Sequence, residues 1–163
     1  MPNLKLQVSR ALSVIPSSDT NIPMPNVIIS NVTTGVSANK LIDSGMNFSS
    51  SGVNPLNVQV GDIVYNTTSS LAATVTNVDS ATQLSLNANI MSASNNYTLY
   101  LGTNTTGSVE PCVLYVGTGG DLNVTTAGGD SLSLINVPSG TFIPIQVIKV
   151  TQFSTASDII ALW

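Results

Sequence analysis

The 163-residue sequence is poor in the side chains on which most enzymes and metalloproteins depend. It contains no histidine, a single glutamate (Glu110) and a single cysteine (Cys112). The commonest general base and the commonest transition-metal ligand are therefore missing. One cysteine forms no disulfide within the chain, and no histidine is present to activate it, so we interpret Cys112 as a small buried apolar residue. We expect no enzymatic activity, no cofactor and no metal centre.

Charge is scarce as well. Charged residues make up 7% of the chain, against roughly 25% in typical soluble domains. The four basic residues are scattered and the net charge is −4, so we expect no nucleic-acid partner. No apolar run has the length of a membrane span, and the first residues lack the apolar core of a signal peptide. A surface of serine, threonine and asparagine has little charge to keep copies apart, which favours protein–protein contacts.

Short β-strand patterns are what the chain does contain. Apolar and polar residues alternate through CVLYV, DLNVTT and DSLSLIN between positions 112 and 136, and TFIPIQVIKV follows at 141–150. Glycines at 117–120 and 128–129 suit tight turns. The pattern predicts a compact antiparallel meander of four strands. In GTGGD (117–121) we favour a hairpin turn over a phosphate-binding loop, because neither a lysine nor a helix follows it.

The remaining segments are also β-like. Leu4, Leu6 and Val8 alternate in an opening strand, and a weak further strand is indicated within 31–39. The segment 41–60 reads as a loop, and 101–111 reads as a linker. Other strands are predicted at 26–30, 57–66, 71–78, 82–88, 96–101 and at the end of the chain. The one short helical turn that we expect surrounds Ser157.

This many short strands bury their apolar faces most readily as two sheets packed face to face. We therefore predict an all-β protein, with an antiparallel, jelly-roll-like β-sandwich as its main part. Residues 1–30 and 108–163 are expected to form this host sandwich. A small β-barrel-like module, residues 31–107, is expected to be inserted into it.

Pieces at both ends of the chain resemble one protein family. A Pro-Ser-Asp-Thr element lies at 16–20, and a "CxxLYVGxGGD" strand and turn lies at 112–121. A "GGD" hairpin (128–130), a "VPxGTxxPxxV" strand (137–147) and a terminal "IxALW" (159–163) follow. These motifs, in this order, resemble the head spike base and head decoration proteins of tailed phages and gene transfer agents. The middle segment is similar to small β modules of phage structural proteins.

The resemblance implies a structural protein on the capsid surface of a virion. It would decorate the head as a spike base, or cement neighbouring capsomers, through symmetric contacts. The implied partners are the major capsid protein and further copies of the chain, as a trimer or a pentamer. The alternative is a receptor- or glycan-binding module of a tail or spike fibre, with the middle module as the reader.

Few residues qualify as site candidates. Four aromatic residues are candidate interface anchors, because aromatic side chains are enriched at binding hot spots: Trp163, Phe142, Phe153 and Tyr115. Asp121 and Asp130 flank one predicted hairpin and could meet there around a calcium ion, although turn-stabilising roles are favoured. A glycosidase needs two placed carboxyl groups, and Glu110 lies in a linker before a proline, so we set hydrolysis aside.

Overall fold

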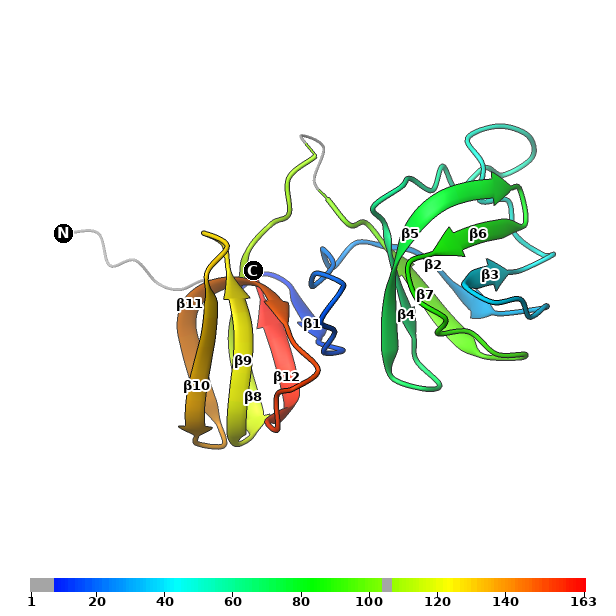
Figure 1. Cartoon of the computed structure of the whole chain (residues 1–163). Helices are drawn as coiled ribbons and strands as arrows, with labels where there is room; N and C mark the ends of the chain where they lie inside the picture. The colour runs from blue at the N-terminus through cyan, green and yellow to red at the C-terminus, as the bar shows by residue number, and fades with distance from the viewer. Residues whose placement is uncertain (1–7, 104–106) are drawn as a thin grey trace. The chain divides into compact units, whose positions relative to one another are not determined.

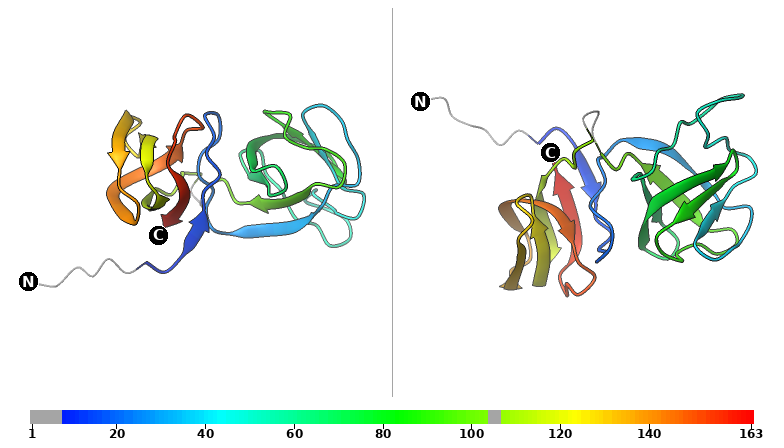
Figure 2. Two further views of the ribbon diagram at one scale, coloured as in Figure 1. Left: turned by 90° about the horizontal axis from the view of Figure 1, so that it is seen from below. Right: turned by 45° about the horizontal axis from the view of Figure 1, so that its top comes forward.

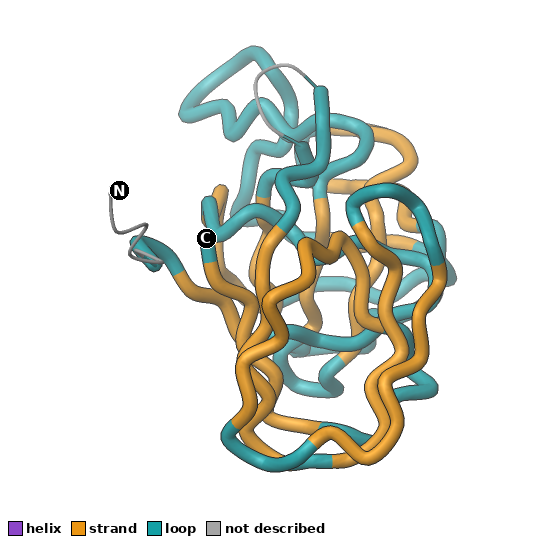
Figure 3. The backbone as a smooth tube through the Cα atoms, turned by 90° about the vertical axis from the view of Figure 1, so that its left-hand side faces the viewer, coloured by secondary structure: helices purple, strands orange, loops and turns teal. Residues whose placement is uncertain are grey.

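The computed structural model describes residues 8–103 and 107–163, and within them every regular element is a β-strand (Figures 1, 2 and 3). The chain divides into two compact units. Residues 8–14 and Pro111–Trp163 form the first unit, and residues 15–103 and 107–110 belong to the second. Each unit contains one six-stranded antiparallel sheet. The predicted all-β, antiparallel fold class is thus confirmed.

The first unit folds its sheet into two layers around one core. Its strands lie in the order β1-β12-β8-β11-β9-β10. Their bounds are β1 (Ala11–Ser13), β8 (Cys112–Thr118), β9 (Gly120–Thr126), β10 (Ser131–Val137), β11 (Thr141–Val150) and β12 (Ser157–Leu162). The long strand β11 pairs with β8 along its first half and with β9 along its second. Figure 1 shows β9 and β10 in front of β8 and β11. Leu114, Leu122 and Val147 are fully buried in the core.

The predicted meander is wrong, because consecutive strands of this unit are mostly not neighbours. β8 and β9 are separated in the sheet by β11, so the GTGGD segment carries the chain between layers and is no hairpin turn. Its glycines are needed for close backbone approach. A Cβ on Gly120 would lie 2.7 Å from the backbone nitrogen of Ala156, a separation that real Cβ atoms do not show. The predicted turn at Gly128–Gly129 is present, between the paired strands β9 and β10.

The second unit is a sheet in the order β2-β7-β4-β5-β6-β3. Its strands are β2 (Val27–Val32), β3 (Lys40–Ile42), β4 (Ile63–Asn66), β5 (Leu71–Ser80), β6 (Gln83–Leu86) and β7 (Asn96–Tyr100). Its apolar core includes Phe48, Leu84 and Leu99, none of which is exposed. The ten-residue strand β5 pairs first with β4 and then with β6, with register shifts that curl the sheet.

The two edge strands of this curled sheet meet at one end. Just beyond β2, the backbone N–H of Thr34 donates to the carbonyl of Ile42 at 2.9 Å, and Gly35 forms a bridge with the same residue. Along β2 itself, no strand of the described chain pairs with the outer edge. A barrel-like shape for the module therefore stays a prediction, since the hydrogen-bonded closure covers only this end.

Several predicted boundaries need correction. Because β2 pairs with β7, the second unit begins at residue 15 and ends at 110, whereas the sequence indicated 31 and 107. The predicted loop 41–60 overlaps strand β3, whose three residues are too few to show an alternation. Ser157 begins β12, so the expected helical turn is wrong. Val8 is exposed ahead of the short β1, and Leu4 and Leu6 lie outside the described residues.

Candidate functional site

The outer face of one layer of the first unit is apolar. Cross-strand pairing aligns Ser13, Ile160, Tyr115 and Phe142 in one row across β1, β12, β8 and β11. A second row consists of Ala11, Leu162 and Val113. On β8 and β12, the residues that alternate with these, such as Leu114 and Ile159, are buried in the core. The two rows together are called the outer apolar face. The exposed carboxylate of Asp158, two residues before Ile160 on β12, borders this face and lines one pocket with Ala11, Ser13 and Ile160.

The largest side chains of this face form an aromatic pair. The ring centroids of Tyr115 and Phe142 lie 5.1 Å apart, with the rings tilted by 57°. Phe142 remains 57% exposed. A solvated aromatic pair on a mainly apolar sheet face is a poor arrangement for a monomer and a suitable one for a contact surface, since aromatic side chains supply large contact area at low entropic cost.

The outer face of the other layer is mainly polar, with Ile135 of β10 as an exposed apolar exception. On β9 and β10 the residues that alternate with the core are Asn123 and Thr125, opposite Ser133 and Ser131. The hydroxyl of Ser133 donates to the side-chain oxygen of Asn123. The two outer faces of the sandwich thus differ in chemistry, as expected when one faces water and the other a protein partner.

The structure brings together only two of the four predicted interface anchors. Tyr115 and Phe142 are cross-strand partners. Phe153 is 72% exposed in the connection between β11 and β12, where its carbonyl accepts a hydrogen bond from the Asn123 amide. Trp163 is half-buried at the end of the chain, and its backbone exchanges hydrogen bonds with Arg10. Sequence reasoning missed Ile160 and Leu162 as members of the face, although their alternation with Ile159 and Ala161 carried that signal.

The predicted calcium pair is not assembled. Asp121 lies at the start of β9 and accepts a hydrogen bond from the backbone N–H of Asn136, beside the far end of β10. Asp130 lies in the turn after β9, where its backbone N–H donates to the Thr126 hydroxyl. The two carboxylates are therefore at opposite ends of the β9–β10 hairpin. In the described part of the chain no three potential metal-binding side chains of His, Cys, Asp or Glu gather.

Two other reactive groups have surroundings that explain their roles. Cys112 is buried, its thiol faces the Val147 carbonyl, and burial raises its pKa to about 12. At neutral pH it is therefore a protonated core residue. Glu110 is exposed in the segment that precedes β8, outside any regular element, and so lacks the apolar enclosure that is typical of a catalytic acid.

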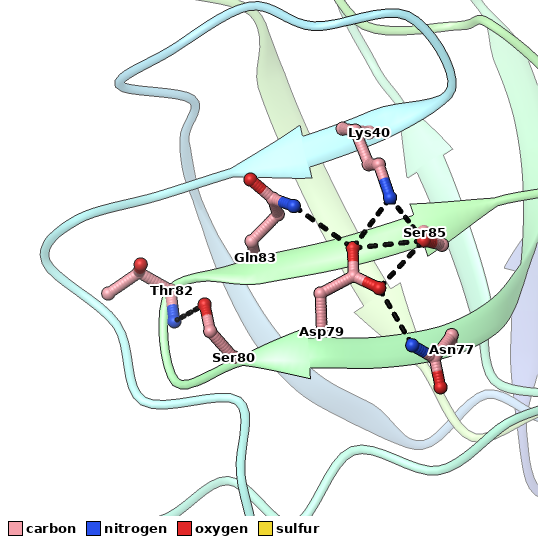
Figure 4. A network of polar contacts seen from close by, with 7 residues as sticks. All are labelled: Lys40, Asn77, Asp79, Ser80, Thr82, Gln83 and Ser85. Carbon is pink, nitrogen blue, oxygen red and sulfur yellow. Dashed lines mark hydrogen bonds and ion pairs between the residues drawn. The ribbon is translucent and has the colours of Figure 1, made fainter.

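In the second unit the densest polar cluster surrounds Asp79 (Figure 4). Lys40 forms an ion pair with its carboxylate at 2.8 Å, and Gln83, Asn77 and Ser85 donate further hydrogen bonds to it. These donors, the ammonium of Lys40 foremost, hold the pKa of Asp79 well below its usual range. The cluster joins β3, β6 and β5, and with one carboxylate already engaged by four side chains we interpret it as structural.

A second carboxylate, Asp43, is buried and fully engaged. One of its oxygens accepts hydrogen bonds from the Tyr97 hydroxyl and the Asn31 amide, each at 2.8 Å. The other accepts the backbone N–H of Gly45 at 3.0 Å. Burial, and then the neighbouring carboxylate, raise the pKa of Tyr97, so this phenol stays a proton donor. The trio ties β7, β2 and the turn after β3 together.

Comparison with known proteins gives no assignment: no family model, no curated protein and no solved structure matches the chain. Among the described residues there is also no helix with the length and hydropathy that a membrane crossing requires.

Proposed function

We propose that the protein is a structural component of a phage-like virion, which decorates or cements the capsid surface through repeated protein–protein contacts. The observation that carries the proposal is the outer apolar face on one layer of the first unit, with the exposed Phe142 at its β11 border. The resemblance of the terminal segments to head spike base and decoration proteins supports the same reading. Most of those motifs, from Cys112 to Trp163, build the unit that bears this face.

The distribution of charge supports this assignment of roles. Residues 15–110 contain one lysine and five acidic residues, a net charge of −4. The rest of the chain has three basic and three acidic residues, so its net charge is zero. A unit with no net charge and a mainly apolar face packs against a protein surface with little charge repulsion, whereas an acidic unit is better placed in water. The first unit is thus the proposed anchor, and the second projects.

The size of the face explains why symmetry matters. Strands β8, β11 and β12 contribute about 20 Å of length each and the three-residue β1 about 10 Å, which at about 4.8 Å spacing gives a footprint on the order of 300 Å². Stable binary complexes bury about 800 Å² per partner. One such contact is therefore weak, and a capsid lattice that presents many copies raises the overall affinity through multivalency. The proposed partners are the major capsid protein and further copies of this chain, as a trimer or pentamer.

Mass spectrometry of purified virions tests the proposal. The chain is expected as a stoichiometric component that stays bound after gradient purification. Rebinding of recombinant protein to particles that lack it then tests the face. Phe142→Lys is expected to reduce rebinding at least tenfold, while Ile135→Lys, an equally exposed apolar residue on strand β10 of the other layer, retains it. Absence of the chain from virions, or equal rebinding by both variants, refutes the proposal.

The second candidate function is receptor or glycan binding by the middle unit. One observation favours it: a groove of about 470 Å³ is lined by the side-chain amides of Asn47 and Asn54 beside apolar residues. No aromatic ring lines this groove, and sugar-binding sites usually stack a sugar on one. Glycan arrays probed with the full chain, and competition of phage adsorption by it, separate this role from capsid decoration.

A further inference from the structure

The groove of the second unit lies beside β2, an edge strand whose outer side is paired with no other strand of the described residues. The bridge between Gly35 and Ile42 sets an antiparallel register for the two chain segments that meet there. If the same register continued, Met46 would lie opposite Asn31 and Phe48 opposite Ile29. Such pairing would cover the outer edge of β2 with a neighbouring strand.

The chain turns away before it can do so. The backbone N–H of Met46 donates to the carbonyl of Asp43, and that of Gly45 donates to the Asp43 carboxylate. Asp43 is itself held by Asn31 and Tyr97. The chain then runs into a loop that is closed on itself, with the Asn47 amide bound to the carbonyls of Ser51 and Val53 at 2.8 and 3.0 Å. No backbone hydrogen bond joins the described residues 45–56 to β2.

The groove between β2 and the loop 45–56 has properties that suit the binding of an extended peptide. Ile29 of β2 forms part of one wall, and Met46 and Leu56 of the loop contribute to the other. All three are partly buried apolar side chains packed against the core. Its volume, about 470 Å³, is within the range of ligand-binding pockets. The unpaired edge of β2 offers backbone donors and acceptors that only another extended backbone satisfies in series.

We propose that this groove binds an extended peptide segment of a partner protein by strand addition along β2. The edge of β2 supplies main-chain hydrogen bonds, and the apolar walls accept alternate side chains of the added strand. The charge of the unit, −4, selects a segment with basic and no acidic residues around its apolar positions. The site is separate from the outer apolar face and does not depend on the proposed virion role.

Titration of the full chain with synthetic peptides tests the proposal, with NMR as the readout. The probe is the nonapeptide SKVSLSVKS, blocked at both ends, which alternates apolar and polar residues between lysines. Saturable shifts are expected at the backbone amides of Val27–Val32 and at the methyl groups of Ile29 and Met46. SKVPLPVKS, in which proline removes ladder donors, and the acidic SEVSLSVES are each expected to bind at least tenfold more weakly.

Matched variants locate the site. Met46→Lys places a charge in the groove and is expected to raise the Kd at least tenfold. Val60→Lys makes the same change at an exposed valine that does not line the groove, and is expected to shift the Kd less than threefold. Equal binding of the proline peptide, or shifts confined to other strands, overturns the proposal, and the peptide comparison holds even if a variant does not fold. Shifts at β2 that appear with protein concentration alone would show that a second copy fills the groove, and overturn it too.

Discussion

The hydrogen bond between Tyr97 and Asp43 gives the sharpest stability prediction for the second unit. The phenol is 1% exposed and donates at 2.8 Å to a carboxylate that is itself 1% exposed. A hydrogen bond to a charged group contributes about 1.5–3 kcal/mol net, because water cannot replace the lost donor at a buried site. Tyr97→Phe keeps the ring and removes only the donor. We expect it to lower the unfolding free energy of this unit by about 1.5–3 kcal/mol, a large part of the 5–15 kcal/mol of a typical domain.

Amide hydrogen exchange of the central strands β4 and β5 measures this loss, since the slowest amides report the free energy of opening the whole unit. The single tryptophan, Trp163, belongs to the first unit, so its fluorescence on urea unfolding provides an internal reference that should not change. Tyr115→Phe, at a half-exposed phenol of the first unit, is the matched control. Because Asn31 and Tyr97 contact the same oxygen, Asn31→Ala combined with Tyr97→Phe should depart from additivity by 0.5 kcal/mol or more. A loss below about 0.5 kcal/mol for Tyr97→Phe refutes the reasoning.

Three further outcomes are expected. The methyl group added by Gly102→Ala would overlap the backbone carbonyl of Gly61, so this variant should lose more than about 2 kcal/mol of unfolding free energy, measured by urea unfolding. The methyl group added by Gly128→Ala meets only ordinary van der Waals contacts, so this control should lose less than about 1 kcal/mol. Burial raises the pKa of Asp62 above the usual value of about 3.9, so the contribution of Asp62 to stability is largest below that pH and falls as the pH rises. Asp62→Asn should therefore lower the unfolding free energy less at pH 7 than at pH 3. An equal loss at both pH values would contradict this. The Cys112 thiol, with its pKa raised to about 12, should resist alkylation by iodoacetamide at pH 8 until the first unit unfolds. Mass spectrometry measures the alkylation, and rapid alkylation of the native protein would contradict this expectation.

Local pattern predicted the strands well where the alternation was long. The strands at 63–66, 83–86 and 96–100 fall inside the predicted segments, and the strand at 71–80 extends two residues beyond its predicted segment, 71–78. The agreement arises because a curled sheet with one buried face imposes a period of two on its sequence. β3 was missed since its three residues derive their strand conformation from pairing with β6, a contact distant in sequence. A prediction from local β-propensity does not include the stabilisation that a strand gains from pairing with a distant segment.

Topology was the larger failure, and the glycines of GTGGD show why. Glycine permits a positive φ, but it also permits a backbone to pass where any Cβ would collide. The sequence does not distinguish these two uses. Gly117 and Gly120 are required by the close approach of Asp158 in β12 and of Thr155–Ala156 in the connection before it, some forty residues later in the chain. The predicted hairpin was therefore consistent with the local sequence but wrong for the fold. It placed β8 beside β9, whereas β8 lies beside β11.

The same long-range pairing explains why the site was found only in part. Single exposed aromatic residues were visible as candidates, yet a binding face is a property of several strands in register. Tyr115 and Phe142 are 27 positions apart, and Ile160 joins them only because β12 pairs with the other side of β8. Once that register is known, the alternation within β8, β9 and β12 assigns their residues to the core or to the outer face, whereas the register shifts in β10 and β11 interrupt it there. The mainly apolar character of one outer face and the mainly polar character of the other then follow from the sequence, and this difference between the faces is the reason to propose an anchoring role for the first unit.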